Sequence, residues 1–283
     1  MQAPREIAGP KASEAAYRIY VELGVSGCPP AAERNTWQMS IEQQVPLVLI
    51  VVVLAAVQSV FGVGLLVFGT PTLLVLGYPF EQILAILLPC SIVISLLQVV
   101  TGGGFTLEPI RRRMLIFTAP TVLLGTMIVL SAGGSLDIKA IVGVMLIVTA
   151  LLRISLPVQR RMEGLVRRWQ PGFLTGLGVI HGVSNLGGGI LTFIVGSSFE
   201  RKEDVRRHIA FCYGMMASIQ LGALLLTSSP GIAPHLWILL PLLAGTTYLV
   251  VGQRLFRSTG QAVYQWSLTG LIGTYGVLLL VRV

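Results

Sequence analysis

Long apolar runs recur along the chain from residue 45 onward, and short stretches rich in charged residues, proline and glycine separate them. A helix needs about 20 apolar residues to cross the hydrocarbon core of a bilayer, and most of the runs are close to that length. They are continuously apolar rather than alternating, which argues against membrane β-strands. The pattern therefore predicts an all-α integral membrane protein with about eight apolar helical segments: 45–77, 83–101, 114–131, 138–156, 172–199, 209–227, 236–251 and 262–281.

Two of these segments, 45–77 and 172–199, are too long for one crossing and too short for two. Each contains glycine, proline or polar residues that interrupt its apolar run: Gly62, Gly64, Gly69, Thr70, Pro71, Ser184, Asn185, Gly187, Gly188 and Gly189. Glycine costs about 1 kcal/mol in a helix interior and proline about 3 kcal/mol. We therefore expect both segments to break into two shorter helices within the membrane.

The two interrupted segments open two halves of the chain that match at a constant spacing. Identical residues lie 122 positions apart (220 − 98, for example) in three pairs: Glu81 and Glu203, Cys90 and Cys212, Gln98 and Gln220. Internal repeats are common in transporters. The spacing predicts two homologous membrane repeats, 44–157 and 171–283, joined by a basic connecting loop at 158–170.

Clusters of Lys and Arg indicate how the halves are oriented, because basic loops stay on the cytoplasmic side of a membrane. In the first half the connection near 78–81 has no Lys or Arg, and the next one carries three arginines at 111–113. In the second half the order reverses, since the cluster lies within 201–207 and 228–235 has none. This reversal favours an inverted repeat, in which each broken helix enters and leaves by one face. A parallel arrangement stays open if the second cluster lies outside.

Residues 1–43 differ from the rest, since they mix charges with prolines and have no apolar run long enough for a signal peptide. We interpret them as a polar flexible N-terminal tail. Met39 stands just before the first membrane segment, so a natural start at Met39 is an alternative. Mass spectrometry of the native N-terminus tests it, and a peptide covering residues 14–34 would refute it.

Composition supports a membrane location: hydrophobic residues make up 54% of the 283 positions, charged residues 11%, and the mean hydropathy is +0.81. Soluble domains usually carry about 25% charge, so the solvent for most of this chain is the lipid bilayer. The net charge of +8 comes from short clusters at the ends of apolar runs, which argues against nucleic-acid binding. The three cysteines have no metal-ligand spacing, and we expect no metal or cofactor. The sequence predicts a multi-pass protein of the cell membrane, the bacterial inner membrane, and leaves a homo-oligomer open.

Three glycine-containing motifs stand at the same point of the two halves: Phe61-Gly62-Val63-Gly64, Gly69-Thr70-Pro71 and Asn185-Leu186-Gly187-Gly188-Gly189. In these motifs, and over most of its length outside the tail, the chain resembles the sulfite exporter TauE/SafE family of membrane transporters. It departs from the family pattern in the first half, where Leu65, Leu66 and Val67 replace a glycine triplet. The resemblance implies export of a small anion such as sulfite or an organosulfonate.

A helix that breaks inside a membrane exposes backbone N–H groups, which need protein or a water-filled cavity beside them. Helix N-termini carry partial positive charge, and glycine lets an oxyanion approach closely. No Asp, Glu, Lys or Arg lies deep in a segment, so amide dipoles are the expected ligands of a small anionic solute. The candidate substrate-binding residues are those of the breaks and two matched glutamines: Gly62, Gly64, Gly69, Thr70, Pro71, Ser184, Asn185, Gly187, Gly188, Gly189, Thr192, Gln98 and Gln220.

Several of these polar and small residues have simpler interpretations beside the functional one. His181, the only ionisable residue well inside an apolar segment, is the proton-coupling candidate, or else a neutral histidine bound to a carbonyl. Gln98 and Gln220 could serve only to form hydrogen bonds between helices. Four glycines with GxxxG spacing are expected at helix contacts: Gly172, Gly176, Gly178 and Gly182.

Two alternatives to a transporter stay open. An intramembrane serine hydrolase would use Gly182-Val183-Ser184 as the start of a nucleophile motif, but Leu186 stands where a glycine should complete it. His208 and His235 lie at segment ends, too far out for a partner at bilayer depth. We therefore expect no enzyme. A channel or membrane assembly protein could use the same fold, and sequence does not separate it from a transporter.

Overall fold

The computed structural model describes residues 41–104, 108–132, 136–154, 164–166, 168–228, 231–260, 263–264, 266–267 and 270. The chain divides into two units, Met1–Gln38 and Met39–Val283, and the described residues all lie in the second. Most of three predicted regions lies outside the described residues: the tail at 1–43, the loop at 158–170 and the last apolar segment at 262–281.

Every regular element in the described part of the chain is a helix. The elements are α2 (Ile41–Phe61), α3 (Leu65–Val75), α4 (Phe80–Thr101), α5 (Pro109–Arg113), η2 (Met114–Thr118), α6 (Ala119–Ser131), α7 (Ile138–Ile154), α9 (Gln170–Ser184), α10 (Gly188–Gly196), α11 (Lys202–Thr227), α12 (Pro234–Thr247), η3 (Tyr248–Gly252) and α13 (Gln253–Ser258). Five stretches within the described residues are long and apolar enough to cross a membrane: Gln44–Phe61, Phe80–Thr101, Pro109–Ser131, Lys202–Thr227 and Pro234–Ser258. The all-helical membrane class is confirmed.

Both predicted helix breaks are confirmed, but the interruption predicted at Gly69, Thr70 and Pro71 is wrong, because these residues lie inside the continuous helix α3. Three residues separate α2 from α3, and three separate α9 from α10. Gly62 begins the first break with φ of 77°, a left-handed conformation that glycine adopts without steric cost. Asn185 begins the second with φ of 63°, and Asn is one of the few other residues that accept this conformation. The local sequence therefore stops each helix at its observed end.

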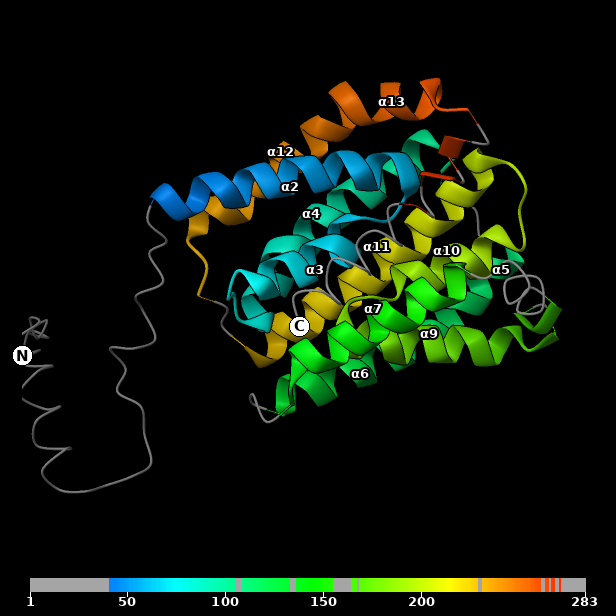
Figure 1. Cartoon of the computed structure of the whole chain (residues 1–283), viewed down its shortest axis with the longest axis horizontal. Helices are drawn as coiled ribbons and strands as arrows, with labels where there is room; N and C mark the ends of the chain where they lie inside the picture. The colour runs from blue at the N-terminus through cyan, green and yellow to red at the C-terminus, as the bar shows by residue number, and fades with distance from the viewer. Residues whose placement is uncertain are drawn as a thin grey trace, which may run out of the picture. The chain divides into compact units, whose positions relative to one another are not determined.

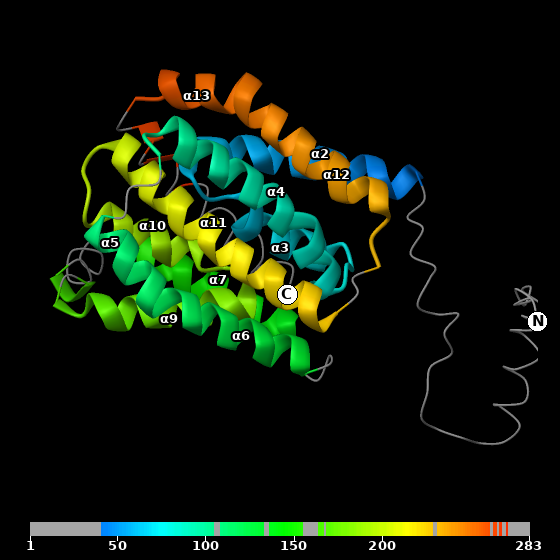
Figure 2. The same ribbon diagram turned by 180° about the vertical axis from the view of Figure 1, so that it is seen from behind.

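Helices α4 and α11 pack against each other in the middle of the described unit, with α2 and α12 on one side and α6 and α9 on the other (Figure 1). Figure 2 shows the same order from behind. Small residues allow the backbones of these neighbouring helices to come close together. A Cβ on Gly214 of α11 would lie 3.0 Å from Ser95 Cβ of α4, and one on Gly252 would lie 2.1 Å from Ser59 Cβ of α2.

The contact between α6 and α9 depends on glycine. A Cβ on Gly182 would lie 2.5 Å from a carbonyl oxygen of α6, and one on Gly178 would lie 2.0 Å from Thr121 Oγ1. The packing role predicted for these two glycines is confirmed. It is wrong for Gly172 and Gly176, because a Cβ on either would meet no described atom within 4 Å.

The two ends of the helix bundle carry different residues. At one end Glu108, just before α5, pairs with Arg207 near the start of α11. At the other end Tyr78, in the loop after α3, shares a cavity of about 640 Å³ with Asp137 and Lys139. Helix α4 joins the two ends. The loop after α3 and the loop after α10 therefore lie at opposite ends.

Helix α11 begins at Lys202, about two turns before the predicted segment 209–227. Two acidic residues in its first turn stabilise the N-terminal end of the helix dipole. In its second turn Arg207 and His208 both contact Glu108. The apolar run underestimates the length of this helix, because the first two turns are rich in charged residues that polar contacts hold in place.

Candidate functional site

The two broken helices meet inside the unit. Asn185 donates a hydrogen bond from Nδ2 to Thr70 Oγ1 of α3 at 2.8 Å, and both side chains are fully buried. The Asn185 backbone N–H also bonds to the His181 carbonyl oxygen at 2.7 Å, which closes the end of α9. We refer to these three residues and their buried neighbours Gly187, Gly188 and Tyr213 as the crossing.

Two helix N-termini without a side-chain cap face the crossing. The N-cap residues are Gly64 for α3 and Gly187 for α10, and neither helix has a side-chain cap hydrogen bond. Val67 in the first turn of α3 lies directly against Gly188 in the first turn of α10. Unpaired N–H groups in a first turn carry about half a positive charge. The crossing therefore offers backbone donors and positive potential to a buried guest.

Several buried polar atoms at and beside the crossing have no hydrogen-bond partner in the described part of the chain: both ring nitrogens of His181, Asn185 Oδ1, Tyr213 Oη and Gln220 Oε1. The Gln220 side chain approaches His181, and the Val67 backbone approaches Tyr213, but neither contact reaches hydrogen-bond geometry. Each unpaired buried polar group costs about 1–3 kcal/mol. So many in one place indicate a site that a polar guest or water completes.

Glycine is required where α10 enters the crossing. A Cβ on Gly187 would lie 2.6 Å from His181 Cβ. A Cβ on Gly188 would lie 2.5 Å from Val67 Cγ2 and 3.0 Å from Tyr213 Oη. Both distances below 3.0 Å are shorter than real contacts allow, so these two glycines hold the half-helix against its neighbours.

The matched glutamines occupy equivalent positions at two helix ends. Gln98 Nε2 donates to the carbonyl oxygens of Gln58 and Ser59 at 2.9 and 3.0 Å, at the end of α2. Gln220 Nε2 donates to the His181 carbonyl oxygen at 3.2 Å, near the end of α9. Interhelical hydrogen bonding, the simpler interpretation, is present in both cases. The side-chain oxygens of both glutamines remain unpaired among the described residues.

The remaining candidates of the first half lie against neighbouring helices. A Cβ on Gly62 would lie 2.9 Å from Ile209 Cγ2, one on Gly64 2.9 Å from the Gln58 nitrogen, and one on Gly69 2.8 Å from Leu87 Cδ1. Pro71 is buried within α3. These positions show close packing, and their predicted contact with a solute stays a prediction.

Thr192 and Ser184, the other polar candidates of the second half, form hydrogen bonds with backbone groups of nearby residues. Thr192 Oγ1 donates to the Gly189 carbonyl oxygen at 2.8 Å. Ser184 Oγ donates to the Ile180 carbonyl oxygen at 2.7 Å and accepts the Leu186 N–H at 3.3 Å. A serine nucleophile needs a hydrogen bond to a base, and among the described residues both hydrogen bonds of Ser184 go to backbone groups instead. The geometry does not favour the hydrolase.

Sequence reasoning missed Tyr213 and a polar cluster beside the first break. Gln58 Nε2 lies 3.0 Å from Ser91 Oγ and 3.4 Å from Ser95 Oγ, and all three side chains are buried. Ser91 and Tyr213 are 122 positions apart (213 − 91), the repeat spacing. Polar residues at that spacing inside apolar runs were the signal that could have found them.

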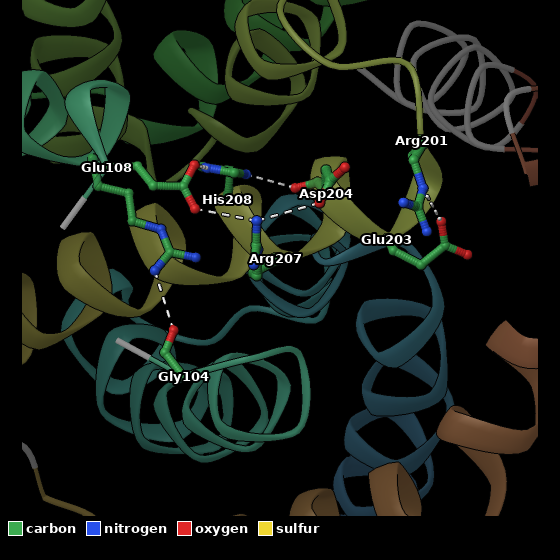
Figure 3. Close-up of polar contacts among 8 residues, drawn as sticks. Gly104, Glu108, Arg201, Glu203, Asp204, Arg207 and His208 are labelled. Carbon is green, nitrogen blue, oxygen red and sulfur yellow. Dashed lines mark hydrogen bonds and ion pairs between the residues drawn. The ribbon is translucent and has the colours of Figure 1, made fainter. Parts of the chain in front are cut away.

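A second polar cluster lies at the basic end of the bundle, the end with Arg207, and holds Glu108, the residue before α5, against α11 (Figure 3). Glu108 Oε2 lies 2.7 Å from His208 Nε2, and Glu108 Oε1 accepts from Arg207 at 3.1 Å. His208 Nδ1 faces the Asp204 carbonyl oxygen at 2.8 Å, and its ring stacks on Phe199 at 4.1 Å. His208 therefore links the Glu108 carboxylate to the first turn of α11.

The charges in this cluster set the acidity of Glu108. Desolvation by burial alone would raise its pKa, but the hydrogen bond and charge of His208, and the charges of Arg207 and Arg111, outweigh it and hold the pKa below the ordinary 4.5. Because the pKa is lowered in the folded protein, the carboxylate stabilises the fold above pH 4.5. That stabilisation is lost as the pH falls through the lowered pKa.

We expect Glu108→Gln to lower the Tm of the detergent-solubilised protein at pH 7 by about 2–4 °C, since about 1 kcal/mol is lost. The difference from wild type should shrink as the pH falls below 4.5 and through the lowered pKa of Glu108, where the wild-type side chain also becomes neutral. Glu203→Gln is the control, because its pair with Arg201 is exposed and 3.8 Å long. If the Tm difference between wild type and Glu108→Gln below the lowered pKa equals the difference at pH 7, the assigned lowering of the Glu108 pKa is contradicted.

Among the described residues no three His, Cys, Asp or Glu side chains come together as metal ligands.

A comparison with protein families matched the family model "Sulfite exporter TauE/SafE" over residues 47–279. Neither the curated proteins nor the solved structures gave a match. The match covers most of the chain and includes both broken helices and the crossing between them. The chain therefore belongs to the sulfite exporter TauE/SafE family of membrane transporters.

Proposed function

We propose that this transporter exports a small oxyanion, sulfite or an organosulfonate, by alternating access around its two broken helices, with the crossing as the binding site. The hydrogen bond of 2.8 Å from Asn185 to Thr70 carries this proposal, because it joins the second break to α3, the half-helix after the first break, in the buried interior. Discontinuous membrane helices whose half-helix N-termini point at an anion are the usual transport site.

The polar groups of the crossing suit a transported anion, which must be bound and then released. Its described polar groups are amide, hydroxyl and imidazole groups, and its positive potential comes from the first turns of α3 and α10. Because none of these groups carries a permanent charge, the anion is held weakly enough to be released. The proposed substrate-binding residues are those predicted from the sequence, with Asn185, Thr70, Gly187 and Gly188 in the centre and Tyr213 added to them.

An inverted repeat is part of the proposal, and matching contacts support it. Gln98 bonds to Ser59, and Gln220 bonds to His181, each residue lying 122 positions after its counterpart (181 − 59, 220 − 98). The loops that follow the two broken helices lie at opposite ends of the bundle, as an inversion requires. By the positive-inside rule the end with Arg207 faces the cytoplasm, in a bacterial inner membrane.

His181 is the proposed proton-coupling residue. Its ring is fully buried beside Tyr213, with centroids 5.7 Å apart, and both nitrogens lack a described partner. A proton on this ring would attract an anion at the crossing. His181→Gln should therefore abolish accumulation driven by a pH gradient, while exchange of anion down its own gradient continues.

Flux measurements on the full chain in liposomes test the function. Sulfite, methanesulfonate and acetate are loaded in turn, and release is followed with and without a pH gradient. We expect saturable flux of sulfite or the sulfonate that responds to the gradient. Flux that rises linearly without saturating would support a channel instead, and no flux of any anion would contradict the proposal.

A further inference from the structure

A second polar cavity, of about 380 Å³, opens at the basic end of the bundle, away from the crossing. The end of α4, the start of α11 and helix α13 enclose it, and its lining includes Gln98, Gly102, Lys202, Arg206, Phe256 and Arg257. Nothing in the family assignment accounts for it.

The cavity has an excess of positive charge. Four basic and two acidic residues line it. The two acids have partners, since Glu203 lies 3.8 Å from Arg201 and Asp204 lies 3.3 Å from Arg207. Arg206 and Arg257 have no carboxylate within 4.0 Å in the described part of the chain. Both line the cavity, so an anion in it faces two guanidinium groups that no described carboxylate neutralises.

Arg206 is held in place rather than free at the surface. It is 7% exposed, its guanidinium lies 3.5 Å from the centre of the Phe256 ring, and Nη1 donates to the Ser59 carbonyl oxygen at 3.1 Å. Lys202 approaches the same ring at 4.7 Å and donates to the Phe256 carbonyl oxygen at 3.0 Å. Phe256 therefore positions two cations at the cavity wall.

The inner wall of the cavity reaches the first helix break. Gln98 is 1% exposed, lines the cavity, and has an unpaired Oε1. Its Nε2 and Arg206 Nη1 both bond to the Ser59 carbonyl oxygen, three residues before Gly62. A ligand in the cavity would thus sit between the basic surface and the end of α2.

We propose that this cavity is an oxyanion-binding vestibule, in which Arg206 and Arg257 hold a sulfonate-, sulfite- or phosphate-like group next to the first break. Charge-assisted bonds from two guanidinium groups suit the tetrahedral sulfonate and phosphate groups and the pyramidal sulfite ion, because each presents several oxygens that accept. The anion comes either from solution or from the headgroup of an anionic lipid. The identification of a soluble anion with the transported solute rests on the proposed function; the binding of an oxyanion does not.

Binding of sulfite to the full chain tests the vestibule without any transport. The protein is placed in nanodiscs of phosphatidylcholine, with or without phosphatidylglycerol, and sulfite is titrated by calorimetry at low salt. We expect Arg257→Gln to weaken binding about tenfold, the loss of one charge-assisted hydrogen bond. Arg254→Gln is the matched control, because Arg254 is exposed one turn earlier on α13 and does not line the cavity. Arg206→Lys keeps the charge and should weaken binding less than Arg206→Gln.

The outcomes of these experiments distinguish a soluble anion, a lipid headgroup and no anion site in the cavity. Sulfite binding that Arg257→Gln weakens and Arg254→Gln spares supports a soluble anion. Thermal stabilisation by phosphatidylglycerol that only Arg257→Gln removes, without sulfite binding, supports the lipid headgroup. Equal behaviour of wild type, Arg257→Gln and Arg254→Gln with both anions overturns the vestibule. Transport that persists in that last case leaves the proposed function standing, whereas binding without any transport overturns the proposed function alone.

Discussion

Gly188→Ala is expected to reduce transport at least tenfold, because the first residue of α10 has no room for a side chain. The added Cβ would lie 2.5 Å from Val67 Cγ2 and 3.0 Å from Tyr213 Oη. Relief requires α10 to move away from α3, which separates the two uncapped helix N-termini. Overpacking of this kind costs about 1–3 kcal/mol. Initial rates of anion flux in liposomes and Tm in detergent measure the two effects.

Two further variants isolate the cause of the Gly188 effect. Gly196→Ala at the other end of α10 should behave as wild type, since a Cβ there meets no described atom within 4 Å. Val67→Ala removes the methyl group that the new Cβ strikes, so the double variant Gly188→Ala/Val67→Ala should recover part of the lost flux. Wild-type flux in Gly188→Ala alone would show that this contact does not matter.

Asn185→Gly is expected to lower flux by about 10- to 100-fold, the effect of roughly 1.4–2.7 kcal/mol, while the fold persists. Glycine accepts the φ of 63° at this position, so the backbone of the break is retained. The variant removes the side-chain amide, which donates to Thr70 Oγ1 at 2.8 Å and whose Oδ1 has no partner among the described residues.

The partner residue provides the control for Asn185. Thr70→Ser keeps the hydroxyl and should transport at a rate near wild type. Thr70→Val removes it, and its effect should not add to that of Asn185→Gly, because both variants break one hydrogen bond. Fully additive effects on flux would mean that the two residues act separately, which contradicts a shared site.

The helix breaks could be predicted from sequence because their causes are local. Gly62 and Asn185 each adopt a left-handed conformation that few other residues accept, and both stand in runs otherwise long enough to cross a membrane. The start of α11 could not be predicted in this way, because its residues Arg207 and His208 bind Glu108, which lies 99 and 100 positions away in the sequence. An apolar run reports burial in lipid, and it does not report ion pairs.

The geometry of the site was only partly predictable for the same reason. Asn185 and Thr70 were both candidates, but their pairing spans 115 positions and depends on how the halves pack. Gln98 and Gln220 were found by their spacing, and their hydrogen bonds to the ends of α2 and α9 explain why both positions keep an amide. Tyr213 was overlooked because a single tyrosine in an apolar helix resembles ordinary packing.

Whether the anion passes through the crossing is measured most directly by the accessibility of Thr70 to a reagent in water. In a chain without native cysteines, Thr70→Cys is exposed to a membrane-impermeant thiosulfonate reagent, with and without methanesulfonate. Ile238→Cys is the control, since its side chain is 73% exposed on an apolar helix that faces lipid and should stay unlabelled. We predict that Thr70→Cys reacts and that the sulfonate slows the reaction. A Thr70→Cys that stays unreactive from both faces of the membrane, in a protein that still transports, would contradict the account.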